Sequence, residues 1–377
     1  MSACDFLVCG AGIAGASIAA ELAGGANVVV AEREETAGYH TTGRSAALYV
    51  ASYGNETIRA LTAASRRFFD APPAGFADHP LLTPRGCLHI GDAAQADKLD
   101  ALAAELAATG VEVSRIGGAA ACAMVPVLRP EAVAGGVHEP GAADIDVAAL
   151  HGGYLRLARQ RGARMLLGAG IVALDRIGDG WRARLANGES VEARVLVNAA
   201  GAWGDQLAVL AGVATVGLTP CRRTAIILEA PPNVEIGGWP AVIDVDEGFY
   251  FKPEAGRILA SPADETPSAP TDAAPEELDI ALCIERLQAA ADIPVRRVLR
   301  AWAGLRTFAP DRTPVIGFAP ETPGFFWFAG QGGYGMQIAP AAARLGATLA
   351  RGEPAPADIA AYAEAASPAR FAAINLD

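Results

Sequence analysis

A glycine-rich turn near the N-terminus carries the clearest chemical signal in the sequence. Three glycines are spaced G-x-G-x-x-G, after the apolar run 5–9 and before an alanine-rich segment with helical periodicity. This order is typical of a phosphate-binding strand, turn and helix, in which the helix N-terminus directs unpaired N–H groups at an anion. The residues that we expect at a dinucleotide pyrophosphate are Gly10, Gly12, Ile13, Ala14 and Gly15.

A carboxylate follows this turn where ribose binding would need it. Glu32 ends the next apolar run, 28–31. A carboxylate at that place can accept hydrogen bonds from the adenosine ribose diol and disfavours a 2′-phosphate. The glycine spacing alone arises by chance in chains rich in alanine and glycine. The prediction of dinucleotide binding therefore rests on the strand before the turn, the helix after it and Glu32.

Three later segments are candidates for contact with the same ligand. The loop 38–49 offers hydroxyl and N–H groups of Thr41, Thr42, Ser45 and Ala46 to a diphosphate or a reactive ring, although it could be a simple connector. The apolar strand 195–203 ends in small residues, which would let its backbone approach a ligand or merely turn into a helix. A second glycine-rich loop, 331–337, precedes a helix whose dipole could stabilise negative charge.

Composition excludes several classes of protein. The chain has 377 residues, a net charge of -12 and 52% hydrophobic residues. The negative charge argues against nucleic acid and anionic lipid as partners. No apolar stretch approaches the roughly 18 residues of a membrane span, and the N-terminal run lacks the basic flank of a signal peptide.

Cysteine and histidine usage points to a reducing compartment and no metal site. The six cysteines are scattered without a C-x-x-C pair, and the five histidines show no spacing typical of metal ligands. We expect a cytoplasmic protein, with peripheral contact at the inner membrane left open. The sequence indicates neither an electron acceptor nor an oligomeric state, and a monomer is compatible with it.

The order of segments predicts two interleaved domains, a Rossmann-like α/β domain and an α+β domain built on an antiparallel sheet. Residues 1–47, 146–218 and 307–377 have the α/β pattern, and we call them the nucleotide half. Residues 48–145 and 219–306 contain antiparallel-strand patterns without a phosphate loop, and we call them the substrate half. Within the latter we expect helices over 56–69 and 93–108 and strands at 86–90 and 111–113.

Beyond these patterns, the sequence resembles the flavin-dependent amino-acid oxidoreductases of the D-amino-acid oxidase, glycine oxidase and sarcosine oxidase group. The resemblance rests on the first glycine turn, the strand 195–203, the segments 302–306 and 310–317, and the final glycine loop. The segments 38–47, 61–66, 73–76 and 331–335 are most similar to bacterial D-arginine dehydrogenase.

The resemblance implies FAD as the cofactor. It places Glu32 and Arg33 at the adenosine and Val172 near the adenine, with Ser45, Ala46 and residues 332–337 around the isoalloxazine. The sarcosine oxidase branch attaches its flavin to a cysteine at the position of Gly304, so a glycine there implies non-covalent binding. The other residues implied at the cofactor are Thr41, Thr42, Arg44, Ala47, Ala200, Gly201, Trp203, Gly330, Gly332, Gly333, Tyr334, Gly335, Met336 and Gln337.

The resemblance also implies a site for a substrate carboxylate. Arg306, together with Arg223 or its neighbour Arg222, would bind the carboxylate through charge-assisted hydrogen bonds, unless these are surface residues of their strands. Successive strand residues face opposite sides, so only one of the neighbouring pair can point inward, and the match favours Arg223. Tyr250 would add its hydroxyl. The Gly333 carbonyl would accept from the substrate amine, and Tyr53 would cover the substrate.

Departures from the D-arginine enzyme bear on the substrate side chain. Leu48, Val50 and Cys87 stand where that enzyme has a histidine, a threonine and the glutamate that binds the substrate guanidinium. A cationic side chain would be desolvated here without a partner, at a cost of several kcal/mol. We therefore expect a neutral, hydrophobic D-amino acid and not arginine or lysine.

The implied reaction is hydride transfer from Cα of the D-amino acid to FAD, followed by hydrolysis of the imino acid to a 2-oxo acid and ammonia. No histidine or carboxylate presents itself as a base, so we expect the site to lower the pKa of the amine, and the rate to rise with pH and level off. The alternatives are a secondary amine or 2-hydroxy acid as substrate, a protein that binds FAD without turnover, and a nicotinamide-dependent dehydrogenase.

Overall fold

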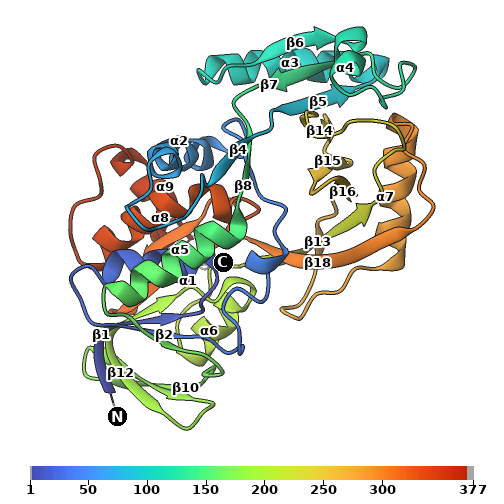
Figure 1. Ribbon diagram of the computed structural model, residues 1–377. Helices are drawn as coiled ribbons and strands as arrows, with labels where there is room; N and C mark the ends of the chain where they lie inside the picture. The colour runs from blue at the N-terminus through green and yellow to red at the C-terminus, as the bar shows by residue number, and fades with distance from the viewer. Residues whose placement is uncertain (1, 372–377) are drawn as a thin grey trace.

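The computed structural model describes residues 2–371, so residue 1 and residues 372–377, at the ends of the expected nucleotide half, lie outside the described residues. Within the described range, one sheet of eight strands and one of ten strands form separate bodies of the molecule, and a third sheet of three strands lies with the first (Figure 1). Helices stack against the eight-stranded sheet, whereas the ten-stranded sheet extends away from it.

The centre of the first sheet is parallel. β1 (Ser2–Cys9) lies between β2 (Val28–Ala31) and β12 (Ser190–Asn198), and β9 (Arg164–Leu166) and β20 (Phe325–Ala329) extend the parallel order on either side. The centres of these strands are apolar because both faces of the sheet are covered. β10 (Ile171–Ile177), β11 (Gly180–Leu185) and β19 (Val315–Phe318) complete the sheet with antiparallel pairings.

The helices of this body pack through small residues. α1 (Ile13–Leu22) contacts both α8 (Gly335–Ala350) and α5 (Val147–Gln160) (Figure 1). Gly346 of α8 faces the sheet so closely that an added Cβ would lie 2.8 Å from a ring carbon of Phe328. The alanine-rich composition therefore allows the helices to approach the sheet and one another.

The position of α2 (Glu56–Asp70) differs from the sequence expectation. The boundary at residue 48 assigns it to the substrate half, but the helix packs on α8, and Ile58, Leu61 and Phe69 join the core that contains β1. Its amphipathic period correctly predicts a helix with one buried face, and it carries no information about which body covers that face. The small sheet of β3 (Leu48–Tyr49), β4 (Leu82–Pro84) and β8 (Ala143–Ile145) flanks this segment in sequence.

The ten-stranded sheet is assembled from both substrate segments. β13 (Thr219–Leu228) pairs along its length with β18 (Val298–Phe308), and β16 (Arg257–Ser261), β15 (Tyr250–Glu254) and β14 (Ala241–Asp244) follow. β14 then pairs in parallel with β5 (Cys87–Gly91), which leads to β7 (Gly135–Glu139) and β6 (Ser114–Gly117). The two-residue strand β17 (Thr266–Pro267) pairs with β13 outside this order.

Three helices accompany this sheet, and two details differ from the sequence expectation. They are α3 (Ala96–Ala108), α4 (Gly118–Met124) and α7 (Glu277–Ala290). The expected strand at 111–113 is absent from the described chain, because the edge strand β6 begins at Ser114, where it can pair with β7. The helix expected over 93–108 begins as a 3-10 turn at Ala93–Gln95, capped by the Asp92 carboxylate.

The two large sheets meet through β18. At its end, β18 pairs with β21 (Gln331–Gly332), so the second glycine-rich loop is part of the ten-stranded sheet before the chain enters α8. Gly304 to Phe308 thus lie where the substrate half and the nucleotide half join. None of the helices in residues 2–371 is long and apolar enough to cross a membrane.

Candidate active site

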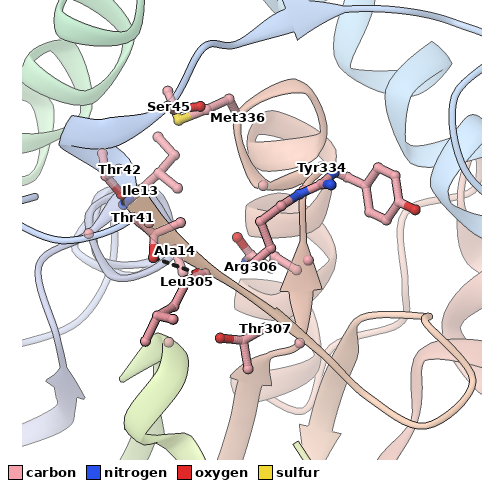
Figure 2. Close-up of a pocket in the computed structure, with 18 of the residues that line it drawn as sticks. Ile13, Ala14, Thr41, Thr42, Ser45, Leu305, Arg306, Thr307, Tyr334 and Met336 are labelled. Atoms are coloured by element: carbon pink, nitrogen blue, oxygen red, sulfur yellow. Dashed lines mark hydrogen bonds between the residues drawn. The ribbon is translucent and has the colours of Figure 1, made fainter. Parts of the chain in front are cut away.

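A cavity of about 1030 Å³ lies between the two halves and contains nearly all of the expected site residues. It extends from the first glycine turn, past the loop 38–49, to the end of β18 and the second glycine loop (Figure 2). Of the residues that the sequence places at the cofactor, at the substrate carboxylate or at the substrate side chain, all line this cavity except Gly15, Cys87 and Arg222, the alternative to Arg223.

The first glycine turn is shaped by contacts that exclude side chains. An added Cβ at Gly15 would lie 1.8 Å from the Gly10 carbonyl oxygen, so this glycine lets the start of α1 pack against the turn. Gly10 adopts φ 103°, a conformation that favours glycine. Gly15 therefore supports the cavity from behind, while Gly10 and Gly12 form its surface.

Glu32 is buried at the cavity wall and already binds the turn. Its carboxylate accepts hydrogen bonds from Ala11 N at 2.7 Å and from Glu34 N at 3.0 Å. Two carboxylate oxygens offer about four acceptor positions, so capacity remains for a ribose diol. Nearby, the Arg33 guanidinium lies 4.2 Å from the Trp203 ring centroid, and these two residues with Val172 line one end of the cavity.

The loop 38–49 is fastened to both halves. The Thr41 hydroxyl donates to the Leu305 carbonyl at 2.7 Å (Figure 2), and the Thr42 hydroxyl accepts from Ile13 N at 2.9 Å. Arg44 donates to the Ala303 carbonyl at 3.0 Å and pairs with Asp272. The two threonine hydroxyls and the Arg44 guanidinium therefore position the loop, and its remaining surface lines the cavity.

Two buried polar atoms at the cavity have no hydrogen-bond partner within residues 2–371. They are the Thr307 hydroxyl oxygen, next to Arg306, and the Gln331 amide nitrogen, at the start of the second glycine loop. Leaving such a group unpaired costs about 1–3 kcal/mol. Sequence reasoning singled out neither residue. Gln331 lies within the loop 331–337 that was predicted to contact the ligand, and Thr307 directly follows a predicted site arginine.

Gln337, in contrast, has hydrogen-bond partners within the chain for both the nitrogen and the oxygen of its side-chain amide. The side-chain nitrogen donates to the Thr62 hydroxyl at 2.8 Å, and the side-chain oxygen accepts from Val50 N at 3.3 Å. These bonds tie α8 to α2 and to the strand end that carries the predicted side-chain pocket. Gln337 thus shapes the cavity while its own amide has partners.

Arg306 is the central charged group at the end of the cavity where the sequence predicts the substrate. It is only 9% exposed, and its Nη2 donates to the Tyr53 hydroxyl at 2.6 Å. An added Cβ at Gly333 would lie 1.4 Å from the same Nη2, so any side chain there would displace the guanidinium. Burial alone would lower the pKa of Arg306, but Tyr53, Tyr250 and Glu265 raise it above its ordinary value.

Arg223 points into the cavity and Arg222 points away from it. The Arg223 Nη2 donates to Glu265 Oε1 at 3.1 Å, and its Nε donates to the Asp264 carbonyl at 2.7 Å. Arg222 pairs with Asp279 at 3.0 Å and with Glu276 on the α7 side of the strand. The strand alternation therefore gives the orientation that the sequence match favours.

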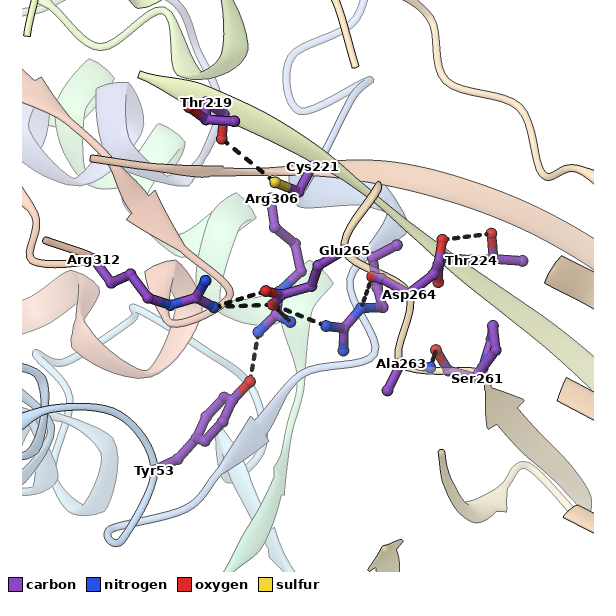
Figure 3. Close-up of polar contacts among 12 residues, drawn as sticks. Tyr53, Thr219, Cys221, Thr224, Ser261, Ala263, Asp264, Glu265, Arg306 and Arg312 are labelled. Atoms are coloured by element: carbon purple, nitrogen blue, oxygen red, sulfur yellow. Dashed lines mark hydrogen bonds and ion pairs between the residues drawn. The ribbon is translucent and has the colours of Figure 1, made fainter. Parts of the chain in front are cut away.

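The arginine cluster contains two members that sequence reasoning missed. Glu265 accepts hydrogen bonds from Arg223 at 3.1 Å, Arg306 at 3.2 Å and Arg312 at 3.0 Å (Figure 3). Glu265 lies in the loop rich in proline and acidic residues, where no periodic pattern assigns a direction to a side chain. Arg312 adopts φ 62°, a left-handed conformation that the sequence does not signal for arginine.

The predicted side-chain pocket is apolar with one imidazole. Leu48, Val50 and Ile243 line the cavity, whereas Cys87 is 0% exposed and lies behind its surface. His89 lines the cavity instead, with its Nε2 at 3.7 Å from the Cys87 sulfur. Burial lowers the pKa of His89 to about 4, so its ring is neutral at pH 7.

The expected lid residue is held from two sides. The Tyr53 ring packs 4.8 Å from the Tyr334 ring, centroid to centroid, and its hydroxyl reaches Arg306. The preceding loop is anchored by Glu139, which accepts from Ala51 N at 2.8 Å and from the Ser52 hydroxyl at 2.5 Å. Burial raises the pKa of Glu139, and these hydrogen bonds partly oppose that shift.

Comparison with known proteins identifies the family. The family described as FAD dependent oxidoreductase matches residues 5–349. The chain belongs to this family. Hydrogen cyanide synthase subunit HcnC of Pseudomonas aeruginosa is 26% identical over 215 residues, which are 55% of this chain and 49% of HcnC. The chain thus aligns with about half the length of that relative.

Solved structures share the fold over almost the whole chain. Glycine oxidase from Geobacillus kaustophilus has a TM-score of 0.82 at 21% identity, covering 94% of this chain and 96% of its own. L-proline dehydrogenase from P. horikoshii has a TM-score of 0.81 at 22% identity, covering 100% of both chains. The mixed α/β architecture predicted from the sequence is confirmed by these likenesses.

FAD is the cofactor of the family, and the cavity fits it. The glycine turn is free of side chains beside the N-terminus of α1, where a pyrophosphate would be stabilised. Glu32 retains acceptor capacity at the adenosine end, and the unpaired Thr307 hydroxyl and Gln331 amide offer polar contacts further along. Gly304 has no side chain that could form a covalent bond to the flavin.

His89, which is half-buried at the cavity wall and has a lowered pKa, predicts a pH-dependent stability. The folded-state pKa of His89 lies below its ordinary value of 6.5, so the unfolded chain binds the proton more readily below pH 6.5. Stability is therefore lost as the pH falls from 6.5 towards 4, by up to about 3 kcal/mol from this residue. Urea unfolding at several pH values should show that His89→Gln removes this part of the acid sensitivity.

His79→Gln, which removes an exposed histidine, controls for the loss of an imidazole. If the wild type and His89→Gln lost stability in parallel between pH 7 and 4, His89 would not have the lowered pKa on which this prediction rests.

Proposed function

We propose that this protein oxidises the carbon–nitrogen bond of an amino acid whose carboxylate is held by Arg306 and Arg223. The observation that carries the proposal is the convergence of these two guanidiniums, from adjacent strands, on one carboxylate group at the cavity. The group that they hold here is the Glu265 carboxylate, and this contact supports a site that can bind the carboxylate of a substrate. A guanidinium fork forms paired, charge-assisted hydrogen bonds with such a group.

The protein contributes to the proposed reaction by positioning the substrate. Arg306 and Arg223 fix the carboxylate, the Tyr250 hydroxyl adds a third contact, and the Gly333 carbonyl accepts from the amine. FAD, when bound, supplies the acceptor for the hydride that leaves Cα. Because the protein holds the reacting carbon in one orientation, the reaction takes place within the bound complex and does not depend on a chance encounter of the reactants. The imino acid product is then hydrolysed by water to a 2-oxo acid and ammonia.

The titratable groups at this end of the cavity support an amine that is neutral before reaction. His89 is held neutral by burial, and Arg306 is a cation with a raised pKa. Cationic neighbours disfavour an ammonium group, so they lower the pKa of the bound amine. The rate should therefore rise with pH and then level off.

The apolar wall supports a neutral side chain on the substrate. Leu48, Val50 and Ile243 would contact it, and the neutral His89 offers no negative partner to a cation. The similarity of several segments to bacterial D-arginine dehydrogenase supports a D-amino acid. A neutral, hydrophobic D-amino acid is thus the substrate that we propose.

Two other substrate classes have specific support. The likeness to L-proline dehydrogenase, named for a secondary amine, supports a secondary amine as an alternative. Glu247 lines the cavity and could meet the end of a long cationic side chain. The hydrophobic, secondary-amine and cationic candidates would all present a carboxylate to Arg223 and Arg306. Neither feature therefore changes the proposed requirement for a carboxylate.

A substrate panel separates these possibilities. FAD-loaded protein is mixed without oxygen with D- and L-leucine, D-arginine, N-methyl amino acids and 2-hydroxy acids, and loss of flavin absorbance is followed. We expect D-leucine to reduce the flavin fastest. Faster reduction by N-methyl amino acids or D-arginine would assign the corresponding alternative, and reduction by none would indicate FAD binding without turnover on these classes.

The arginine assignment has a matched pair of variants. Arg306→Lys keeps the charge but loses the guanidinium fork, so kcat/KM should fall by about 100-fold or more. Arg222→Lys makes the same change on the opposite face of β13, where the side chain pairs with Asp279 and does not line the cavity. The charge beside Asp279 is kept, so kcat/KM should stay within about threefold of the wild type. Equal losses in both variants would remove the basis for the carboxylate site.

A further inference from the structure

The Glu265 carboxylate lies where the proposed function places the carboxylate of the substrate. We propose that Glu265 is an internal competitor: it occupies the Arg223 and Arg306 pair when no substrate is bound, and it gives up these two contacts and keeps only Arg312 when a substrate carboxylate enters. This inference rests on the proposed function, because it requires that the arginine pair bind the substrate carboxylate.

The hydrogen bonds of Glu265 define the competition. Its Oε1 accepts from Arg223 Nη2 at 3.1 Å and from Arg306 Nη1 at 3.2 Å, and these are the donors that a substrate carboxylate would need (Figure 3). A carboxylate at this point and a second carboxylate bound to the same donors would repel each other. Glu265 and the substrate therefore exclude one another from the arginine pair.

The neighbouring residue shows how Glu265 can leave while the loop stays in place. The Asp264 carboxylate accepts from Thr224 N at 2.7 Å and from the Thr224 hydroxyl at 3.1 Å, so the loop is anchored to β13. The side chain of Asp264 is 7% exposed, whereas that of Glu265 is 27% exposed. Asp264 is thus a buried anchor, and Glu265 borders solvent into which its side chain can rotate.

Arg312 is the contact that Glu265 can keep when it leaves Arg223 and Arg306. Its Nη2 lies 3.0 Å from both carboxylate oxygens, and its side chain is 48% exposed, so it is the outer member of the cluster. The guanidinium carbon also lies 3.9 Å from the Phe308 ring centroid, which holds the cation near the cavity. With substrate bound, Arg223 and Arg306 would hold the substrate carboxylate and Arg312 would keep Glu265.

A fixed structural role for Glu265 makes the opposite prediction. If Glu265 served as a permanent spacer that holds the arginines in position, its loss would loosen the pair and weaken carboxylate binding. If it competes, its loss frees the pair and strengthens binding. The sign of the change in affinity therefore decides between the two roles.

The test measures the affinity of the FAD-loaded protein for 2-methylpropanoate, a carboxylate without an amine, by calorimetry and by perturbation of the flavin spectrum. If Glu265 fills the pair about nine-tenths of the time, Glu265→Gln should lower the Kd about tenfold. Glu276→Gln is the matched control, because it removes an equivalent charge from Arg222 on the other face of β13, and it should leave the Kd unchanged.

A second variant changes the affinity in the other direction. Arg312→Gln removes the outer position and confines Glu265 to the pair, so the Kd should rise several-fold in the wild-type background. In the Glu265→Gln background the same change should have less than about a twofold effect, because nothing remains to be displaced. An equal effect in both backgrounds would show that Arg312 acts only through its charge and would overturn the proposal.

The outcomes separate this inference from the proposed function. An unchanged or higher Kd in Glu265→Gln, with normal binding by the wild type and loss of binding in Arg306→Lys, would refute the competitor and leave the carboxylate site intact. No measurable binding to the wild type or to any of the variants would refute the carboxylate site itself. Melting temperature and FAD content of each variant show whether it is folded and loaded.

Discussion

The buried guanidinium of Arg306 is the interaction on which the substrate end of the molecule depends. A cation with so little exposure to water needs acceptors around it, and the space that its guanidinium fills must be free of other side chains. Tyr53 and Glu265 supply acceptors, and Gly333 supplies the space. The lid, the acidic loop and the second glycine loop come from distant parts of the sequence, and each is constrained by this one group.

β18 explains why the cofactor end and the substrate end of the cavity are so close. The strand pairs with β13 in the substrate half and, at its end, with β21 in the second glycine loop. Gly304 lies beside the loop that contains Thr41, and Arg306 and Thr307 follow on the same strand. A single strand therefore connects the cavity wall that is expected at the cofactor with the proposed carboxylate site.

The sequence predicted those parts of the site that depend on local order. A strand, a glycine turn and a helix place their groups relative to one another whatever surrounds them. Strand alternation limited the inward-facing side chain to one of Arg222 and Arg223, and the resemblance to the family selected Arg223. The partner of α2 could not be predicted, because an apolar face does not specify what covers it. Glu265 and Arg312 lie in irregular segments, and only the three-dimensional arrangement brings them to the arginine pair.

The distribution of charge defines the site as much as its shape does. Three guanidiniums surround one internal carboxylate, and the apolar wall with its neutral His89 is adjacent to the pocket that they form. This distribution favours an anionic group at one end of the substrate and no charge at the other. The requirement for a carboxylate is thus the claim from which the proposed chemistry follows.

That claim is tested most directly by comparing an amino acid with its amide. D-leucine and D-leucinamide have the same Cα, amine and side chain and differ only in the group that the arginines would hold. Anaerobic reduction of the flavin should be rapid with D-leucine and slower by about two orders of magnitude or more with the amide, since the charge-assisted contacts are lost. Equal rates with the acid and the amide would contradict the account.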